Sequence, residues 1–168
     1  MRVAVTGTPG TGKTTATDHL ETALDVLHLN EAVRDHDLTE GVDDERDSLV
    51  VDIEAVEEWL GDRTDVLVES HVAHYLDADR VIVLRAHPEE IERRLGERDE
   101  SAASIRENAE SEALDVILTE AVEGHGTDSV YEIDTTDRSP EEVAAEIEAV
   151  LDGEREPSAG TVSFIDWL

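Results

Sequence analysis

The octapeptide GTPGTGKT at residues 7–14 is the feature that most restricts what this chain can fold into. It fits the pattern G-x-x-x-x-G-K-[ST], and a β-branched run (VAVT, 3–6) precedes it while a helical pattern follows it. In that setting glycines let backbone amides turn toward phosphate oxygens, and the following helix presents its N-terminus to the same anion. The stretch therefore predicts a nucleotide phosphate site after a buried strand.

Lys13 is the only lysine in the chain, and the other twelve basic residues are arginines. In a phosphate loop the lysine ammonium reaches the β- and γ-phosphates, and the hydroxyl of the next residue, here Thr14, faces Mg²⁺. A compact ammonium on a flexible stem fits there, whereas a planar guanidinium has the wrong shape. We therefore expect ATP and Mg²⁺ as cofactors, Lys13 as a catalytic residue and Thr14 as a metal ligand.

This loop lies in a strongly acidic chain, with 44 acidic residues against 13 lysines and arginines and a formal net charge of −31. The charges are interspersed with periodic apolar segments, so we expect a folded domain with an acidic surface rather than disorder. Such acidity, with a single lysine in the chain, is typical of proteins from halophiles that accumulate salt. An ordinary acidic protein is the alternative. The charge also disfavours direct nucleic-acid binding, because no basic surface displaces counterions from phosphates.

Signals for targeting or cross-linking are missing from the sequence. The chain has no cysteine and no apolar stretch of 18 residues, and a strand-like run stands directly at its start. We therefore expect a cytoplasmic protein without disulfides, thiolate metal sites or a membrane partner.

Strand and helix patterns alternate along the chain. Short β-branched runs, mostly apolar on both faces as in a covered parallel sheet, lie at 3–6, 25–29, 65–70, 80–85 and 130–134. Helical patterns lie at about 13–24, 52–60, 88–97, 101–122 and 140–151. Ser139 and Pro140 mark the start of the last helix. The alternation predicts an α/β fold of three layers, with a five-stranded parallel sheet flanked by helices.

Two segments depart from this alternation within what we expect to be a single domain. Residues 30–50 are highly charged and suggest an insertion over the sheet edge. Residues 152–168 begin as a linker and end in an apolar cluster formed by Phe164, Ile165, Trp167 and Leu168. That cluster fits either a segment docked on the core or a peptide that binds a partner.

Glu69 lies at the end of the third predicted strand, in the run DVLVESH, and His71 follows it. A phosphate-loop protein often carries an acid at the end of a neighbouring strand, near the metal. Glu69 is therefore a candidate for orienting Mg²⁺, through water or directly, and His71 for positioning a water or the transferred group. The alternatives are a solvated acid at a strand end and a loop histidine that makes only a hydrogen bond.

The arginines are the second set of candidates, because charge spreads over the phosphoryl oxygens in the transition state. They are concentrated in ERRLGER, and a further arginine follows at position 106. Some are expected to pair with glutamates one helical turn away. Arg98, at the predicted helix end, is our candidate for a phosphate clamp, and Arg34 in the charged segment is the candidate on the acceptor side.

Four stretches together, GTPGTGKTT, LVESH, IRENAESEALDVILTEA and YEIDTTDRSPEEVAAEI, resemble the small adenylate-kinase-like P-loop proteins of archaea and eukaryotic nuclei. The resemblance covers about residues 2–151. The P-loop is common to many NTPases, whereas the acid–x–His motif and RENxExE are more specific. That family combines nucleoside-monophosphate (NMP) kinase and ATPase activities with late maturation of the small ribosomal subunit. The resemblance implies an NMP-kinase-like domain at 1–151 and a C-terminal tail at 152–168.

At matching positions the resemblance implies an NMP-binding segment at about 30–53 that contains Arg34, a short lid at about 97–107, and an adenine pocket near 134–136. Many relatives have Asp where this chain has Glu69. Relatives commonly have Arg-Gly-Tyr where it has RDES (98–101), so an aromatic contact with adenine is lost. The implied ATP-site residues are Gly7, Gly10, Gly12, Lys13, Thr14, Thr15 and Arg98.

We therefore expect transfer of the γ-phosphoryl group of Mg·ATP to AMP or another NMP, with ATPase activity and a role in 16S rRNA maturation. The catalytic candidates are Lys13, Glu69, His71 and Arg98. One alternative is a ribosome-assembly ATPase whose partner is a small-subunit ribosomal protein. Another is a kinase for a shikimate- or gluconate-like acceptor on the same fold. The preferred monophosphate, the dominant role and the oligomeric state stay open.

Overall fold

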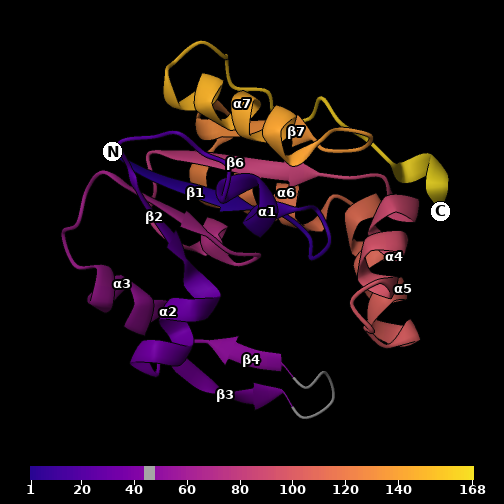
Figure 1. Cartoon of the computed structure of the whole chain (residues 1–168), viewed down its shortest axis with the longest axis horizontal. Coiled ribbons are helices and arrows are strands. Elements are labelled where there is room, and N and C mark those ends of the chain that lie inside the picture. The colour runs from indigo at the N-terminus through magenta and orange to yellow at the C-terminus, as the bar shows by residue number, and fades with distance from the viewer. Residues whose placement is uncertain (44–47) are drawn as a thin grey trace.

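The computed structural model describes residues 1–43 and 48–168, and a five-stranded parallel sheet lies at its centre (Figure 1). The strand order is β2-β5-β1-β6-β7. The bounds are β1 (Arg2–Thr6), β2 (Asp25–His28), β5 (Val66–Glu69), β6 (Arg80–Arg85) and β7 (Val130–Asp134). The predicted strands agree with these to within one residue at each end, and the predicted fold class is confirmed.

Helices cover both faces of the sheet, which explains why the strands are apolar without alternation. On one face lie α1 (Lys13–Thr17) and α7 (Pro140–Leu151); their Ala16, Val143 and Ile147 pack against Val3 and Val5 of β1. On the other face lie the 3₁₀ turn η1 (Ala73–Tyr75) and α6 (Val116–His125), which pack on the intervening strand residues. The predicted start of α7 is confirmed, since the Ser139 side chain accepts from the Glu142 amide.

The charged segment after β2, expected as an insertion over the sheet edge, contains regular elements that the sequence analysis did not name. It forms α2 (Leu29–His36) and an antiparallel hairpin of β3 (Thr39–Asp43) and β4 (Ser48–Val51), before α3 (Ile53–Leu60). Leu29 and Val33, four residues apart, bury one face of α2 against α3 and β5. Its other positions are mostly charged, which hid the helix in the sequence. Residues 44–47 of the predicted NMP-binding segment lie outside the described residues.

The helix predicted at 13–24 is wrong in length, because α1 ends at Thr17. The Thr17 hydroxyl donates to the carbonyls of Lys13 and Thr14, at 2.9 and 3.1 Å. Such back-bonding weakens helix continuation. Residues 18–24 then run as turns and coil to the edge strand β2.

The helix predicted at 101–122 is two helices, α5 (Ala102–Ala113) and α6. Asp115 separates them in the left-handed conformation, with φ 57°. Its carboxylate accepts from Arg85 at 2.6 Å. The turn lets α5 pack on α4 (Pro88–Gly96) while α6 packs on the sheet. The residue at the break between the two helices, Asp115, thus binds Arg85 of β6, which is distant in sequence.

Arg85 is the largest buried side chain of the described residues, with 1% of its surface exposed. Its guanidinium donates to Glu112 at 3.0 Å, to Glu132 at 2.7 Å and to Asp115. Glu112 also accepts from the Ala86 amide at 2.9 Å and from the Thr8 hydroxyl at 3.3 Å. These ion pairs join the phosphate loop, β6, β7 and the start of α6.

The C-terminal segment is docked on the core, as one of the two readings of its apolar cluster expected. The amides of Thr161 and Val162 donate to Glu132 at 2.7 and 3.0 Å. The Phe164 ring lies 5.5 Å from the Arg85 guanidinium carbon. The chain ends in a short 3₁₀ helix, η3 (Ile165–Trp167), against α5.

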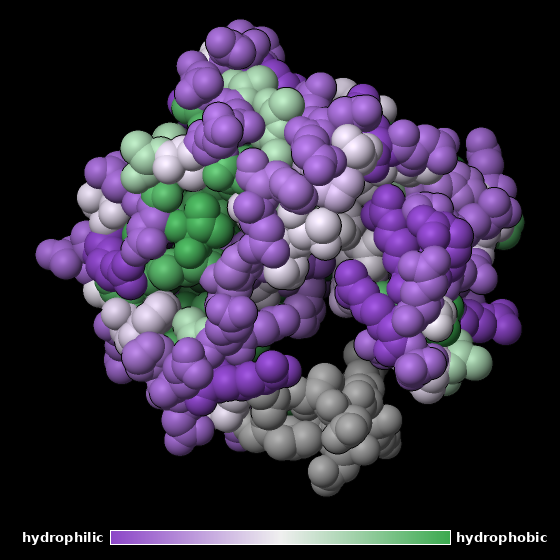
Figure 2. Space-filling view, in the orientation of Figure 1, coloured by the Kyte–Doolittle hydropathy of each residue, from purple (hydrophilic) through white to green (hydrophobic). Residues whose placement is uncertain are grey.

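The face in Figure 2 is mostly hydrophilic, with apolar side chains gathered in limited patches. This fits the net charge of −31. Across the described part of the chain, no helix combines the length and apolar character needed to cross a membrane.

Replacing Arg85 with methionine should destabilise the fold by about 3–5 kcal/mol, because three carboxylates would lose their buried counter-charge. The free energy of unfolding is measured by chemical denaturation in molar KCl. Arg106→Met is the matched control, since Arg106 is exposed and pairs with Glu110 of its own helix. Equal stabilities of the two variants would contradict the central role of Arg85.

Candidate nucleotide site

Two glycines let the phosphate loop lie close to the elements around it. Gly7 has φ 150°, and a Cβ there would lie 2.6 Å from the carbonyl oxygen of Leu84. Gly10 has φ 96°, in the left-handed region, and its Cβ would lie 3.2 Å from Leu95 of α4. Side chains at these positions would push the loop away from β6 and α4.

Lys13 is folded back onto the loop that precedes it. Its ammonium donates to the carbonyls of Gly7 at 2.8 Å and Thr8 at 3.2 Å, and the residue is 9% exposed. Burial lowers the pKa of Lys13 to about 8; the carboxylate of Glu69 opposes this shift, and the charge of Arg98 adds to it. A phosphate beside this ammonium would favour its charged form.

Glu69 lies at the carboxyl end of β5 and binds two neighbouring side chains. Its Oε1 accepts from the Thr14 hydroxyl at 2.9 Å and from His28 Nδ1 at 2.8 Å, and the residue is buried. The other ring nitrogen of His28 lies 3.1 Å from Asp18. Burial alone would lower the pKa of His28, but the hydrogen bond and charge of Glu69 leave it raised.

Thr14 and Glu69 provide a hydroxyl and a carboxylate, and these oxygen donors suit Mg²⁺. The ion prefers few protein ligands and keeps waters and substrate phosphates for its other positions. Both residues line the same cavity as Lys13. The donor set therefore fits the metal that the sequence analysis expected.

Most of the predicted phosphate-site residues meet at one small cavity of about 110 Å³. Its lining is Pro9, Gly10, Gly12, Lys13, Thr14, Asn30, Glu69, His71 and Arg98. Burial lowers the pKa of His71 to about 4, and the charge of Lys13 adds to the shift. His71 is therefore a neutral imidazole at pH 7, able both to donate and to accept a hydrogen bond.

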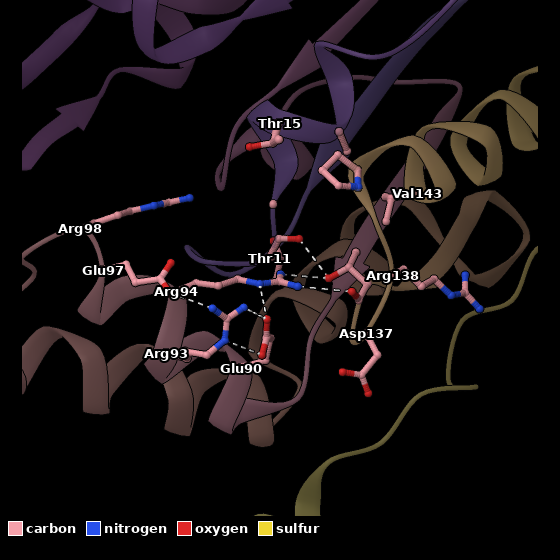
Figure 3. A pocket seen from close by; sticks show the side chains of 14 residues that line it. Thr11, Thr15, Glu90, Arg93, Arg94, Glu97, Arg98, Asp137, Arg138 and Val143 are labelled. Carbon is pink, nitrogen blue, oxygen red and sulfur yellow. Dashed lines mark hydrogen bonds and ion pairs between the residues drawn. The ribbon is translucent and has the colours of Figure 1, made fainter.

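A larger cavity of about 620 Å³ shares Gly12 and Arg98 with the small one (Figure 3). Thr15, Thr135 and the start of α7, Pro140 and Val143, also line it. The predicted adenine pocket near 134–136 thus contributes Thr135 to this cavity. Figure 3 shows Arg98 reaching along one side of it, toward α1, which carries Thr15.

Arg94 is a site residue that the sequence analysis did not single out. Its guanidinium donates to the Gly10 carbonyl at 3.1 Å, to the Thr135 hydroxyl at 3.3 Å and to Glu90 at 2.9 Å. The signal was its spacing: Arg94 and Arg98 are four residues apart, one helical turn. Arg93, by contrast, pairs with glutamates of its own helix, as expected.

Arg34 and Asn30 both belong to α2 but differ in position. Arg34 is exposed and lines neither of the two cavities, so its acceptor role stays a prediction. Asn30 lines the small cavity and was not predicted. The available signal was its place directly after β2, at the sheet edge where parallel strands present ligand-binding residues.

Comparison with known proteins shows the family to which the chain belongs. A family model described as "AAA domain" matches residues 3–115. Proteins named "Putative adenylate kinase" from Natronomonas pharaonis and Halobacterium salinarum are each 62% identical to the chain, with all of both sequences covered. The chain belongs to this adenylate-kinase-like P-loop family. Both relatives come from halophilic archaea, which fits the prediction of a halophilic member.

Solved structures support the fold of this adenylate-kinase-like chain. A shikimate kinase from Acinetobacter baumannii, in complex with shikimate, matches with a TM-score of 0.56 over 92% of this chain and 94% of that one. Only 16% of residues are identical, so the likeness concerns the fold alone. It agrees with the P-loop kinase fold predicted from the sequence.

Beneath the phosphate loop, this family member buries a histidine in a hydrogen-bonded chain. His74 is 3% exposed; its Nε2 donates to Glu120 at 2.7 Å, and Tyr75 donates to the same carboxylate at 2.6 Å. Because Nε2 carries the proton, Nδ1 accepts from the Thr6 hydroxyl at 2.8 Å. Burial lowers the pKa of His74 although Glu120 opposes the shift. His74 is therefore neutral in the fold.

The neutral state of His74 predicts a pH dependence of stability. Its pKa is lower in the fold than in the unfolded chain, where it is about 6.5. The unfolded state thus gains the proton first as pH falls, and this contribution, full above pH 6.5, is lost below it. His74→Gln should make the free energy of unfolding fall less between pH 7 and pH 5.

The measurement is chemical denaturation at fixed ionic strength, with the parent protein measured over the same pH range. A His74→Gln profile parallel to that of the parent would argue against a neutral buried histidine.

Proposed function

We propose that this protein is an NMP kinase that transfers the γ-phosphoryl group of ATP to AMP or a related NMP, with ATPase activity when water is the acceptor. The observation that carries the proposal is the convergence of Lys13, Thr14, Glu69, His71 and Arg98 on one small cavity. The larger cavity beside it shares Gly12 and Arg98 and offers room for the rest of a nucleotide.

In this proposal the chain supplies binding and charge rather than a covalent intermediate. Lys13 leaves the carbonyls of Gly7 and Thr8 and binds β- and γ-phosphate oxygens. Arg98 and Arg94 bind the oxygens on which charge grows as the bond between the γ-phosphorus and its bridging oxygen breaks. An acceptor oxygen attacks from the opposite side. Mg²⁺, held by Thr14 and Glu69, would neutralise charge on the β- and γ-phosphates when bound.

His71 is proposed to orient the acceptor or a water. As a neutral imidazole it can hold an attacking oxygen through its free lone pair or donate to a phosphoryl oxygen. Asn30 and Arg34 are proposed to bind the monophosphate, because α2 follows β2, and β2 pairs with β5, the strand that ends at Glu69. Exclusion of water by the segment at 97–107 would then separate kinase from ATPase turnover.

A role in maturation of the small ribosomal subunit, through a small-subunit ribosomal protein, is the second candidate. It rests on the family resemblance and on the acidic surface, which would suit a basic partner. Stimulation of ATP hydrolysis by such a protein, in the absence of AMP, would favour this role over NMP phosphorylation.

The deciding experiment supplies ATP with AMP, CMP, GMP, UMP, shikimate or gluconate to the purified protein in molar KCl, with and without Mg²⁺. We expect AMP-dependent formation of ADP. Turnover with shikimate or gluconate alone would show a small-molecule kinase instead of an NMP kinase.

Lys13→Met should lower both kinase and ATPase turnover by more than about a hundredfold, while the circular dichroism spectrum is unchanged. Retained turnover would refute this assignment.

Arg98→Ala should lower kcat by about a hundredfold or more and change KM for ATP by less than about threefold, because the charge it binds develops in the transition state. Steady-state kinetics of AMP phosphorylation measure both constants. Arg63→Ala, which removes an arginine that pairs with Asp25 and lines neither cavity, is the control and should behave as the parent. An unchanged kcat would remove Arg98 from the catalytic group.

A further inference from the structure

The chain after residue 157 is held along β7 by interior hydrogen bonds, and we call residues 158–168 the C-terminal strap. The Ser158 amide donates to the Val130 carbonyl at 3.0 Å, and the Glu132 amide donates to the Ser158 hydroxyl at 2.9 Å. The Thr161 and Val162 amides then donate to the fully buried carboxylate of Glu132. The strap is therefore fixed to the sheet before it reaches α4 or α5.

Phe164 of the strap packs at the joint between β6 and α4. Its ring lies 5.5 Å from the Arg85 guanidinium carbon and 5.4 Å from the His87 ring, edge to face with 72° between the planes. His87 is the N-cap of α4: its Nδ1 accepts from the Glu89 amide at 3.2 Å, and its own amide donates to Thr136 at 2.8 Å. Phe164 thus contacts the residue where α4 begins.

The end of the strap lies against α5. Trp167 and Leu168 line a cavity of about 600 Å³ together with Ile105 and Arg106 of α5 and Glu92 of α4. Figure 1 shows the yellow end of the chain beside α4 and α5. The strap therefore touches the start of α4 and the outer side of the α4–α5 pair.

The other end of α4 touches the phosphate loop. Leu95 packs on Gly10, Arg94 donates to the Gly10 carbonyl, and Arg98 follows in the turn between α4 and α5. A helix of nine residues moves as a unit, so a shift at His87 would displace Arg94 and, at the helix end, the turn that carries Arg98. The contacts of the strap and of the phosphate loop are thus made on one rigid element.

We infer that Phe164 and Trp167 are positioning residues, which hold the α4–α5 pair so that Arg94 and Arg98 face the phosphate loop. The kinetic part of this inference rests on the proposed function. The structural part does not, because the orientation of α4 and α5 can be measured without nucleotide. A role in global stability alone would leave the dynamics of 94–101 and the coupling to Arg98 unchanged.

The first test is hydrogen–deuterium exchange of the full-length protein without nucleotide in molar KCl. Phe164→Ala should speed exchange of the amides at 94–101 at least fivefold and leave those of β1 unchanged. Ile165→Ala, a truncation of the exposed neighbour of Phe164, is the matched control and should exchange as the parent. If Phe164→Ala does not fold, Phe164→Leu, which keeps most of the apolar volume, is measured instead. Unchanged exchange at 94–101 would overturn the inference.

The second test is a double-mutant cycle on kcat. Phe164→Ala should lower kcat about tenfold in the parent but less than twofold in a background that carries both Arg94→Ala and Arg98→Ala, because the strap acts through those two arginines. The same tenfold loss in both backgrounds would overturn the inference. A parent without phosphoryl transfer to any monophosphate would refute the proposed function instead, and the exchange measurement would then decide this inference alone.

Discussion

The ion pairs of Arg85 are the interaction on which the rest of the architecture depends. Its guanidinium holds Glu112, Asp115 and Glu132, which come from three different elements. Glu112 in turn binds the phosphate loop through Thr8, and Glu132 binds the strap. Buried ion pairs often add little net stability, because desolvation offsets their attraction. Their consequence here is geometric, since one guanidinium joins carboxylates that also hold the phosphate loop and the strap.

The sheet was predictable because its determinants are local. Strands covered on both faces are apolar at successive positions, and the phosphate loop between β1 and α1 has its own pattern of glycines. The break between α5 and α6 was not predictable, because the helical pattern runs through Asp115 without interruption. Its carboxylate binds Arg85, thirty residues away in sequence. Periodicity carries no information about such a partner.

The site residues also divide into those predictable from local sequence and those whose partners are distant in sequence. Lys13 and Thr14 belong to a contiguous motif, and Glu69 and His71 follow a strand whose end could be located from the sequence. Structure places these four at one cavity, with Arg98. Arg94 was not predicted as a site residue, because its partner, the Gly10 carbonyl, lies 84 positions away in sequence. Its pairing with Glu90, by contrast, was visible within the helix. A side chain that serves both contacts looks in sequence like an ordinary helical ion pair.

The acidic surface and the cationic side chains of the two cavities act in opposite directions on the binding of a polyanion. A net charge of −31 repels ATP at long range, whereas Lys13, Arg94 and Arg98 attract it at contact distance. Salt separates the two terms, because the Debye length falls to about 3 Å at 1 M while partly buried contacts are screened much less. Molar salt thus removes the repulsion and leaves the contacts. Retaining a single buried lysine amid 44 acidic residues is consistent with binding phosphate in such a medium.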